Sequence, residues 1–305
     1  MIEAMKTAKI FNNKKITGYI ALIIGIFALS LSPILVKTAE APTVVTSFYR
    51  MFFSFCFWTI VLLYRIIRSP KENELTEALP ELRWLIFPLL AGVSSAMDHA
   101  WWATALNLTS VTNTGILNGM APVWIAAAGF IFLHERHGWR FWFGLALSMV
   151  GVVLMSGKGF SFFSEGMNQG DRIALFSSFF YAGYFFFTQL GRRHFSAVFQ
   201  TWASVGFCSL TLWIICRYSG YEMTHYSWDV WKSFILVTLI CQVCGYFSLT
   251  YALGSLPASI VSPSNELNTV LSSVLAVILL GESISLPQGI GCAAITIGIY
   301  LINRK

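Results

Sequence analysis

Apolar residues run through this chain in long continuous stretches, separated by short charged or turn-rich breaks. A helix needs roughly 20 apolar residues to cross about 30 Å of hydrocarbon, and unbroken stretches of that length indicate spanning helices and not alternating strands. The sequence therefore predicts an all-α membrane protein with ten transmembrane helices, near residues 16–36, 43–64, 84–106, 110–133, 140–157, 171–190, 197–217, 230–253, 257–281 and 286–303.

Composition agrees with this picture and narrows the class of protein. The 305 residues are 56% hydrophobic and 11% charged, whereas about a quarter of a soluble domain is charged. The net charge of +6 suits nucleic acid, but the Lys and Arg residues lie between apolar stretches, where membrane topology explains them better. We therefore expect a lipid bilayer around the chain and no nucleic-acid partner.

Positive charge along the chain tests the number and direction of the helices, because cytoplasmic loops are enriched in Lys and Arg. With the N-terminus in the cytoplasm, fourteen Lys and Arg residues fall inside and five outside, and Arg50 alone falls within a span. This asymmetry favours ten helices in the cytoplasmic (inner) membrane, with both termini cytoplasmic.

An internal repeat appears when residues 103–155 are shifted by 147 positions without a gap. The matched pairs include Asn118 with Asn265, Glu135 with Glu282, Gly144 with Gly291, and Gly151 with Gly298. We read two five-helix repeats, at residues 1–157 and 158–305. Because five is odd, the second repeat is inverted in the membrane, which is common in secondary transporters whose site lies where the halves meet.

Motifs in both halves carry a family resemblance. They are SFYRMFFS in the second stretch, NTGILNGMAPVWIAAAGFIFLHERHGW across the fourth and fifth, and SPSNELNTVLSSVLAVILLGESISLPQGIG across the last two. With these motifs the chain resembles the ten-helix EamA-type members of the drug/metabolite transporter superfamily. The resemblance implies inverted repeats around a central cavity. One departure is Thr269, which stands thirteen residues before Glu282 where the family often has Pro.

The ninth predicted helix is unusually polar for a membrane span. Helical spacing places Ser262, Glu266, Thr269 and Ser273 on one stripe, flanked by Asn265. Small polar residues also join helices to one another, but a carboxylate beside amides is better explained by the wall of a wet cavity. We therefore interpret Ser262, Asn265, Glu266 and Thr269 as substrate-binding.

The third predicted helix contributes a second candidate group. Asp98 and His99 lie near its middle and are candidates for binding substrate or carrying a proton. Trp101 and Trp102 are candidates for packing on an aromatic or cationic ligand. The alternatives are a helix-to-helix hydrogen bond for His99 and interfacial anchoring for either Trp.

Polar residues of three further helices complete the candidate site. Asn118 and Thr114 share a face of the fourth helix, and Tyr181 and Tyr184 lie deep in the sixth. Arg50 lies about eight residues into the second span and is interpreted as a structural ion pair with Asp98 or Glu266, although a substrate carboxylate is an alternative partner.

These residues predict a secondary active transporter that exports a small polar or amphipathic metabolite, an amino acid or related compound, by alternating access. Protons or a counter-substrate are candidate coupling partners, and the expected active unit is a monomer. No cofactor or metal is expected. A nucleotide-sugar or organophosphate carrier would need more cavity cations than Arg50, and a channel fits an inverted repeat less well. An intramembrane enzyme is disfavoured because the HExxH motif and a second deep Asp are absent.

Overall fold

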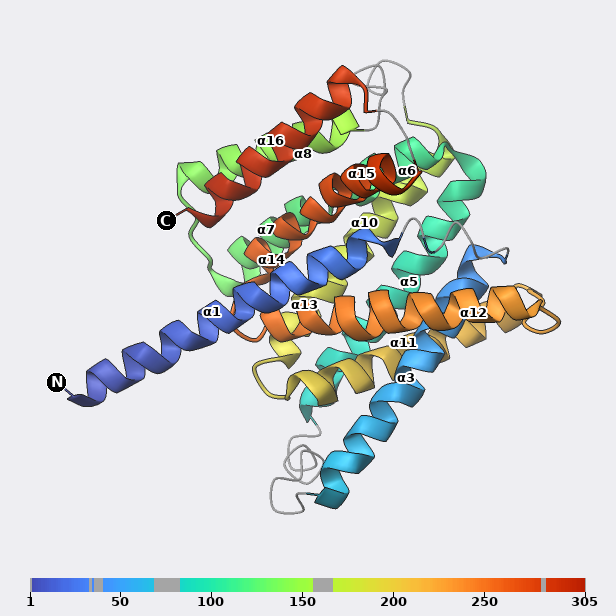
Figure 1. Ribbon diagram of the computed structural model, residues 1–305, viewed down its shortest axis with the longest axis horizontal. Helices are drawn as coiled ribbons and strands as arrows, with labels where there is room; N and C mark the ends of the chain where they lie inside the picture. The colour runs from blue at the N-terminus through green and yellow to red at the C-terminus, as the bar shows by residue number, and fades with distance from the viewer. Residues whose placement is uncertain are drawn as a thin grey trace.

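Figure 1 shows the computed structural model of the chain, which describes residues 2–32, 35, 41–68, 83–155, 167–280 and 284–304. The described part is helical and contains no strand. Its helices are α1 (Ile2–Ser30), α3 (Thr43–Arg68), α5 (Ile86–Leu108), α6 (Val111–Asn118), α7 (Ala121–Leu133), α8 (Trp139–Met155), α10 (Gln169–Gly191), α11 (Ala197–Tyr218), α12 (Trp228–Val237), η3 (Thr238–Tyr246), α13 (Phe247–Ala252), α14 (Ala258–Asn265), α15 (Leu267–Leu280) and α16 (Leu286–Asn303).

Hydropathy and local capping explain why these segments are helical. Among the described residues, six helices are long and apolar enough to cross a bilayer, where a helix satisfies its own backbone groups. Polar residues at their ends fix the first turns. Ser196 accepts a hydrogen bond from the Phe199 backbone at the start of α11, and Asn168 and Asp171 form a capping box at the start of α10.

Three predicted helices are not uniform α-helices. Residues 110–133 form α6 and α7, and residues 257–281 form α14 and α15, which meet at Glu266. Residues 228–252 form one continuous helix, but its middle, η3, has π-helical geometry. Proline contributes to both breaks, because Pro122 lies in the first turn of α7 and Pro263 lies inside α14.

Helices α8 and α16 pack against each other through glycines. A Cβ atom on Gly144 would lie 2.6 Å from the Gly298 carbonyl oxygen, and one on Gly298 would lie 2.5 Å from the Gly144 oxygen. Gly151 and Gly291 approach each other in the same reciprocal way, at 2.8 Å in both directions. The two helices are therefore antiparallel and touch backbone to backbone, as small residues allow in membrane proteins.

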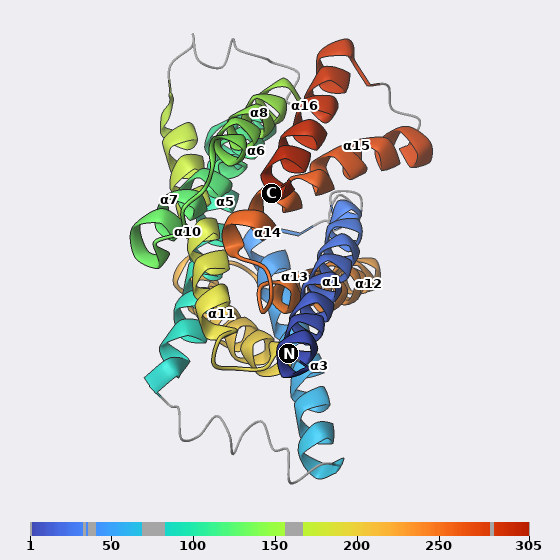
Figure 2. The same cartoon turned by 90° about the vertical axis from the view of Figure 1, so that its left-hand side faces the viewer.

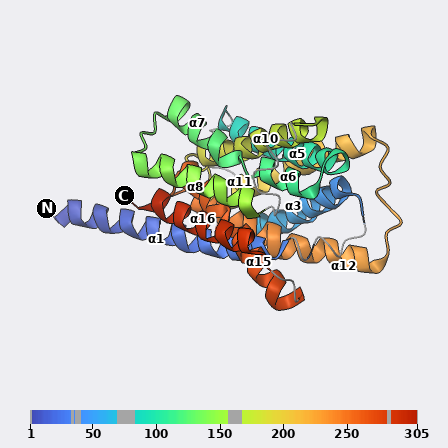
Figure 3. The same ribbon diagram turned by 90° about the horizontal axis from the view of Figure 1, so that it is seen from above.

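Helix α14 lies near the centre of the molecule. Figure 2 shows this helix at the centre of the molecule, between α10 on one side and α1 on the other, and it also contacts α7 and α16. The start of α1 and the end of α16 lie at the same end of the molecule (Figures 1 and 3). The polar residues of α14 are consequently interior, where helices of both halves of the chain can reach them.

Candidate functional site

The first polar cluster joins α5, α6 and α10 around a buried carboxylate. Asn118 Nδ2 donates to Asp98 Oδ1 at 3.0 Å, and Ser177 Oγ donates to the same oxygen at 2.6 Å. Asn118 also lies 3.1 Å from Ser177 Oγ. Asp98 is only 7% exposed. Two donors therefore converge on one carboxyl oxygen of Asp98 and hold this side chain at the junction of α5, α6 and α10.

The second cluster joins Arg50 of α3 to His99 of α5. Arg50 Nη2 lies 2.5 Å from His99 Nε2, and His99 Nδ1 lies 2.6 Å from the Ser95 carbonyl oxygen. Because a guanidinium only donates and a carbonyl only accepts, His99 is the neutral tautomer that carries its proton on Nδ1. The Tyr246 ring of η3 lies 5.8 Å from the Arg50 guanidinium carbon and completes the surroundings of the cation.

In the described part of the chain, neither Asp98 nor Glu266 forms an ion pair with a Lys or Arg side chain. His99 Nδ1 lies 3.9 Å from Asp98 Oδ2, but this imidazole is neutral. The structure thus places Arg50 against a histidine and a tyrosine ring, where the sequence suggested an ion pair with one of these carboxylates.

The third cluster lies where α14 ends. Glu266 caps this helix and is 8% exposed, and the preceding Asn265 is 2% exposed. Asn265 Nδ2 donates to the Tyr181 hydroxyl at 3.3 Å, while its Oδ1 atom has no hydrogen-bond partner. Among the described side chains, none donates to the Glu266 carboxylate. Tyr181 interacts electrostatically with both Glu266 and Asp98, so the first and third clusters face a shared interior.

Other predicted site residues have local partners. Thr114 is fully buried and donates to the Ser110 carbonyl oxygen of its own helix at 3.0 Å, so its hydroxyl is satisfied without a ligand. Tyr184 is also buried, with its hydroxyl 3.4 Å from Thr250 Oγ1. Thr269 is half-buried and lies 3.4 Å from Asn268 Oδ1.

The remaining predicted residues are Ser262, Trp101 and Trp102, and the structure describes all three. Ser262 is buried inside α14, one turn before Glu266. Trp101 packs edge-on against Phe176 at 5.7 Å, and its buried indole nitrogen has no partner among the described residues. Trp102 is half-buried. The stripe that continues from Ser262 to Ser273 is interrupted, because the helix breaks at Glu266. Glu282 lies outside the described residues.

Sequence reasoning missed the contribution of η3 and of Ser177. Gln242 of η3 is 3% exposed and its Oε1 atom has no partner in the described part of the chain. Tyr246, one turn later, reaches Arg50. The π-helical geometry of η3 could not be predicted from ordinary helical spacing. The polar residues Thr238, Gln242 and Tyr246, spaced four apart in an apolar stretch, could still have indicated that this segment contributes to a polar interior. No group of three His, Cys, Asp or Glu in the described residues could hold a metal ion.

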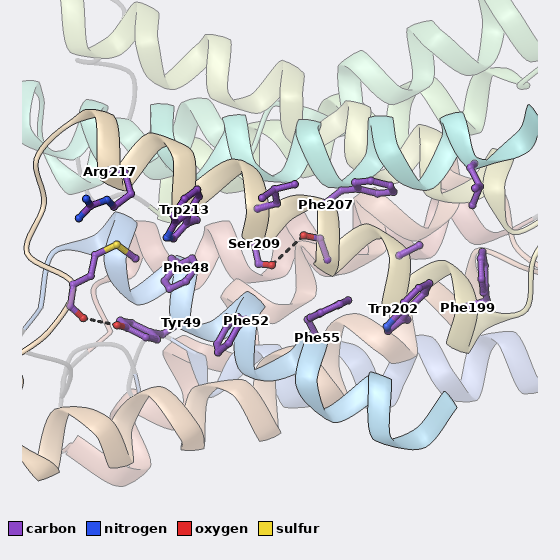
Figure 4. A pocket seen from close by; sticks show the side chains of 15 residues that line it. Phe48, Tyr49, Phe52, Phe55, Phe199, Trp202, Phe207, Ser209, Trp213 and Arg217 are labelled. Carbon is purple, nitrogen blue, oxygen red and sulfur yellow. Dashed lines mark hydrogen bonds between the residues drawn. The ribbon is translucent and has the colours of Figure 1, made fainter. Parts of the chain in front are cut away.

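A separate groove of about 1080 Å³ runs between α3 and α11 (Figure 4). At one end the Tyr49 hydroxyl donates to the Met223 carbonyl oxygen, and Arg217 lies nearby. Its walls are mainly aromatic: Phe48, Phe52, Phe55, Phe199, Trp202, Phe207 and Trp213. None of the predicted site residues lines this groove, so it is distinct from the three polar clusters.

A chain of apolar helices that buries two carboxylates, an arginine and several amides has the architecture of a polytopic membrane protein with a polar interior. Comparison with known proteins identifies the family to which the chain belongs. The model of the "EamA-like transporter family" matches residues 16–157 of the chain, and it matches residues 168–304 a second time. The chain belongs to this EamA-like family of the drug/metabolite transporter superfamily.

Individual relatives agree with the family match. An "Uncharacterized transporter" of Archaeoglobus fulgidus is 25% identical over 304 residues, which cover 96% of this chain and 99% of the relative. The "Uncharacterized transporter YdfC" of Bacillus subtilis is 24% identical over 231 residues, covering 72% and 71%. A solved crystal structure shares the fold, with a TM-score of 0.72, 17% identity and 96% coverage of both chains. The protein is therefore a multi-pass membrane transporter and not an enzyme.

Proposed function

We propose that this protein is a secondary active transporter that exports a small polar or amphipathic metabolite, an amino acid or related compound, across the cytoplasmic membrane by alternating access. The observation that carries the proposal is the pair of interior carboxylates. Asp98 and Glu266 are buried, and among the described residues no Lys or Arg pairs with either. An intramembrane carboxylate is costly unless a partner neutralises it, so a proton or the cationic group of a substrate is the expected partner.

The proposed architecture is ten helices in two inverted repeats, with both termini in the cytoplasm. Helices α6 and α14 have eight residues each, and both their starts and their ends are 147 residues apart. The glycine-rich helices α8 and α16, which share the same offset, run antiparallel. The family model also matches the two halves of the chain separately. The equal offsets and the two family matches support a repeat, and the antiparallel contact of α8 with α16 supports its inversion.

The proposed substrate site lies between the Asn118 end of α6 and the Asn265 end of α14. The orphaned Asn265 Oδ1 atom and the Glu266 carboxylate supply acceptors for an ammonium group, and Tyr181 adds a hydroxyl and an aromatic face. Backbone carbonyls at the ends of broken helices add further acceptors, as in other transporters built from discontinuous helices. Acceptors therefore outnumber donors in this site, which favours a cationic or zwitterionic substrate.

This arrangement disfavours an organophosphate or nucleotide-sugar substrate at the same site. Phosphate recognition needs several free Lys or Arg side chains. Near the three clusters Arg50 is the cation that the structure describes, and it already contacts His99 and Tyr246. We propose that the transporter acts as a monomer and that coupling uses a proton or a counter-substrate.

Exchange in proteoliposomes tests this proposal. Purified protein is reconstituted in liposomes loaded with a mixture of the twenty amino acids, and efflux is measured by mass spectrometry, with and without a proton gradient. Glu266→Gln keeps the shape of the side chain and removes its charge, so we expect efflux to fall at least tenfold while the thermal melting curve stays unchanged. Glu222→Gln, at an exposed loop position, is the matched control and should transport normally. Full transport by Glu266→Gln would remove this carboxylate from the mechanism.

A further inference from the structure

A pocket of about 470 Å³ lies at one end of the bundle, away from the three polar clusters. Four cationic side chains line it: Lys14 and Lys15 of α1, and Arg192 and Arg193, which directly follow α10. Glu135 supplies the one carboxylate of its described lining. The pocket therefore carries a surplus of three positive charges in a space large enough for a small ligand.

One of these cations is fixed in place by the backbone. Arg192 Nε donates to the Thr250 carbonyl oxygen at 3.1 Å, and Nη1 donates to the Phe195 carbonyl oxygen. Its other terminal nitrogen lies against Gly254, where a Cβ atom would be 2.4 Å away. Only a residue without a side chain leaves room for this guanidinium, so Gly254 and the backbone carbonyls together orient Arg192 at the pocket wall.

The carboxylate of the pocket is already engaged. Ser259 Oγ donates to Glu135 Oε2 at 2.6 Å, and His137 Nε2 lies 3.2 Å from the same oxygen. The hydrogen bond from Ser259 therefore ties Glu135 to α14. The described lining therefore contains more cationic side chains than carboxylates.

Membrane topology explains why Lys and Arg are abundant at one end of a membrane protein, but it does not require them to converge. Here two elements separated by about 180 residues of sequence bring four cations around one cavity. Clustered Lys and Arg side chains match the charge and the several acceptor oxygens of a phosphate group better than those of a single carboxylate.

We propose that this pocket binds a phosphate group, carried either by a small phosphorylated metabolite or by a phospholipid headgroup. The inference is independent of the transport proposal, because it concerns a different site and binding is measured without a gradient. Lys14 and Arg193 are the exposed members of the cation set, so their removal should weaken binding without disturbing the fold that Arg192 supports.

Thermal unfolding with added phosphate tests the inference, since a ligand that binds only the folded state raises the melting temperature by an amount that grows with its affinity and concentration. Protein in neutral detergent is titrated with inorganic phosphate and glycerol 3-phosphate at constant ionic strength. A second arm compares nanodiscs of phosphatidylcholine with nanodiscs that also contain phosphatidylglycerol. The variant is Lys14→Gln with Arg193→Gln. The control, Arg172→Gln with Lys232→Gln, removes the same charge from exposed positions elsewhere.

We expect phosphate-dependent stabilisation of the wild type and of the control, and at least a tenfold weaker apparent affinity in the pocket variant. A shift with the soluble anions identifies a phosphorylated metabolite as the source of the group. A shift only in the phosphatidylglycerol nanodiscs identifies a lipid headgroup. No stabilisation in either arm, or an equal loss in the control, would overturn the inference. Intact amino acid transport in the pocket variant would show that the two sites are separate.

Discussion

The contact between α8 and α16 predicts that two Gly→Ala substitutions in α16 change the free energy of unfolding in opposite directions. Gly298→Ala places a Cβ atom 2.5 Å from the Gly144 carbonyl oxygen and 2.8 Å from the Ser148 nitrogen. Ordinary contacts of this kind lie at 3.4–4 Å, so the helices must separate by about 1 Å, on the scale of the overpacking that cores resist. Gly289→Ala, nearer the start of α16, meets no atom within 4 Å.

The two substitutions share the same gain in helix propensity, about 0.5–1 kcal/mol for replacing Gly with Ala. Overpacking at position 298 costs about 1–3 kcal/mol, so we expect a net loss of up to about 2.5 kcal/mol there. At position 289 the propensity gain stands alone, and we expect a stabilisation of about 0.5–1 kcal/mol. Gly144→Ala adds a methyl group at the same contact from α8, so its loss of stability should not add fully to that of Gly298→Ala.

The assay is unfolding in mixed micelles at increasing fractions of SDS, followed by tryptophan fluorescence from the eleven tryptophans. The wild type, the single variants Gly298→Ala, Gly289→Ala and Gly144→Ala, and the double variant Gly144→Ala with Gly298→Ala are compared at one total detergent concentration. If Gly298→Ala were as stable as Gly289→Ala, the close backbone approach of α8 and α16 would be wrong. Fully additive losses in the double variant would contradict a shared crossing point.

Two further substitutions test the polar contacts by the same assay. Asp171→Asn weakens the α10 cap and the 2.6 Å hydrogen bond from Thr109, so it should destabilise the protein by about 1–3 kcal/mol. Its control is Asp229→Asn, which affects an exposed ion pair with Lys232 and should change stability by less than about 0.5 kcal/mol. Ser177→Ala removes the 2.6 Å donor to Asp98; we expect a loss of about 0.6–2 kcal/mol and slower efflux in the liposome assay. An unchanged stability in either Asp171→Asn or Ser177→Ala would contradict the corresponding contact.

Helix positions could be predicted from the sequence because the bilayer requires long apolar stretches. The predicted stretches 197–217 and 286–303 agree closely with α11 (Ala197–Tyr218) and α16 (Leu286–Asn303). The positions of the breaks within 110–133 and 257–281 could not be predicted, since hydropathy averaged over a window stays high across one or two non-helical residues. Proline at 263 pointed to the second break but did not fix its position at Glu266.

The candidate site could be predicted only in part. The sequence singled out Asp98, Asn118 and Glu266 because polar residues are unusual at membrane depth, and the structure places all three in the interior. Which of them share hydrogen bonds depends on how helices rotate and cross, which a single sequence does not encode locally. The same limit explains why the contact between Arg50 and His99 was not predicted.

The hydrogen bond between Arg50 and His99 makes two events mutually exclusive. The Nε2 lone pair that accepts from the guanidinium is the same lone pair that would bind a proton. The imidazole can therefore be charged only after the guanidinium has moved away, and two adjacent cations would then repel each other. A movement of α3 relative to α5 that breaks this hydrogen bond would expose the Nε2 lone pair, so the relative position of these two helices and the state of one ring nitrogen are linked through a single contact.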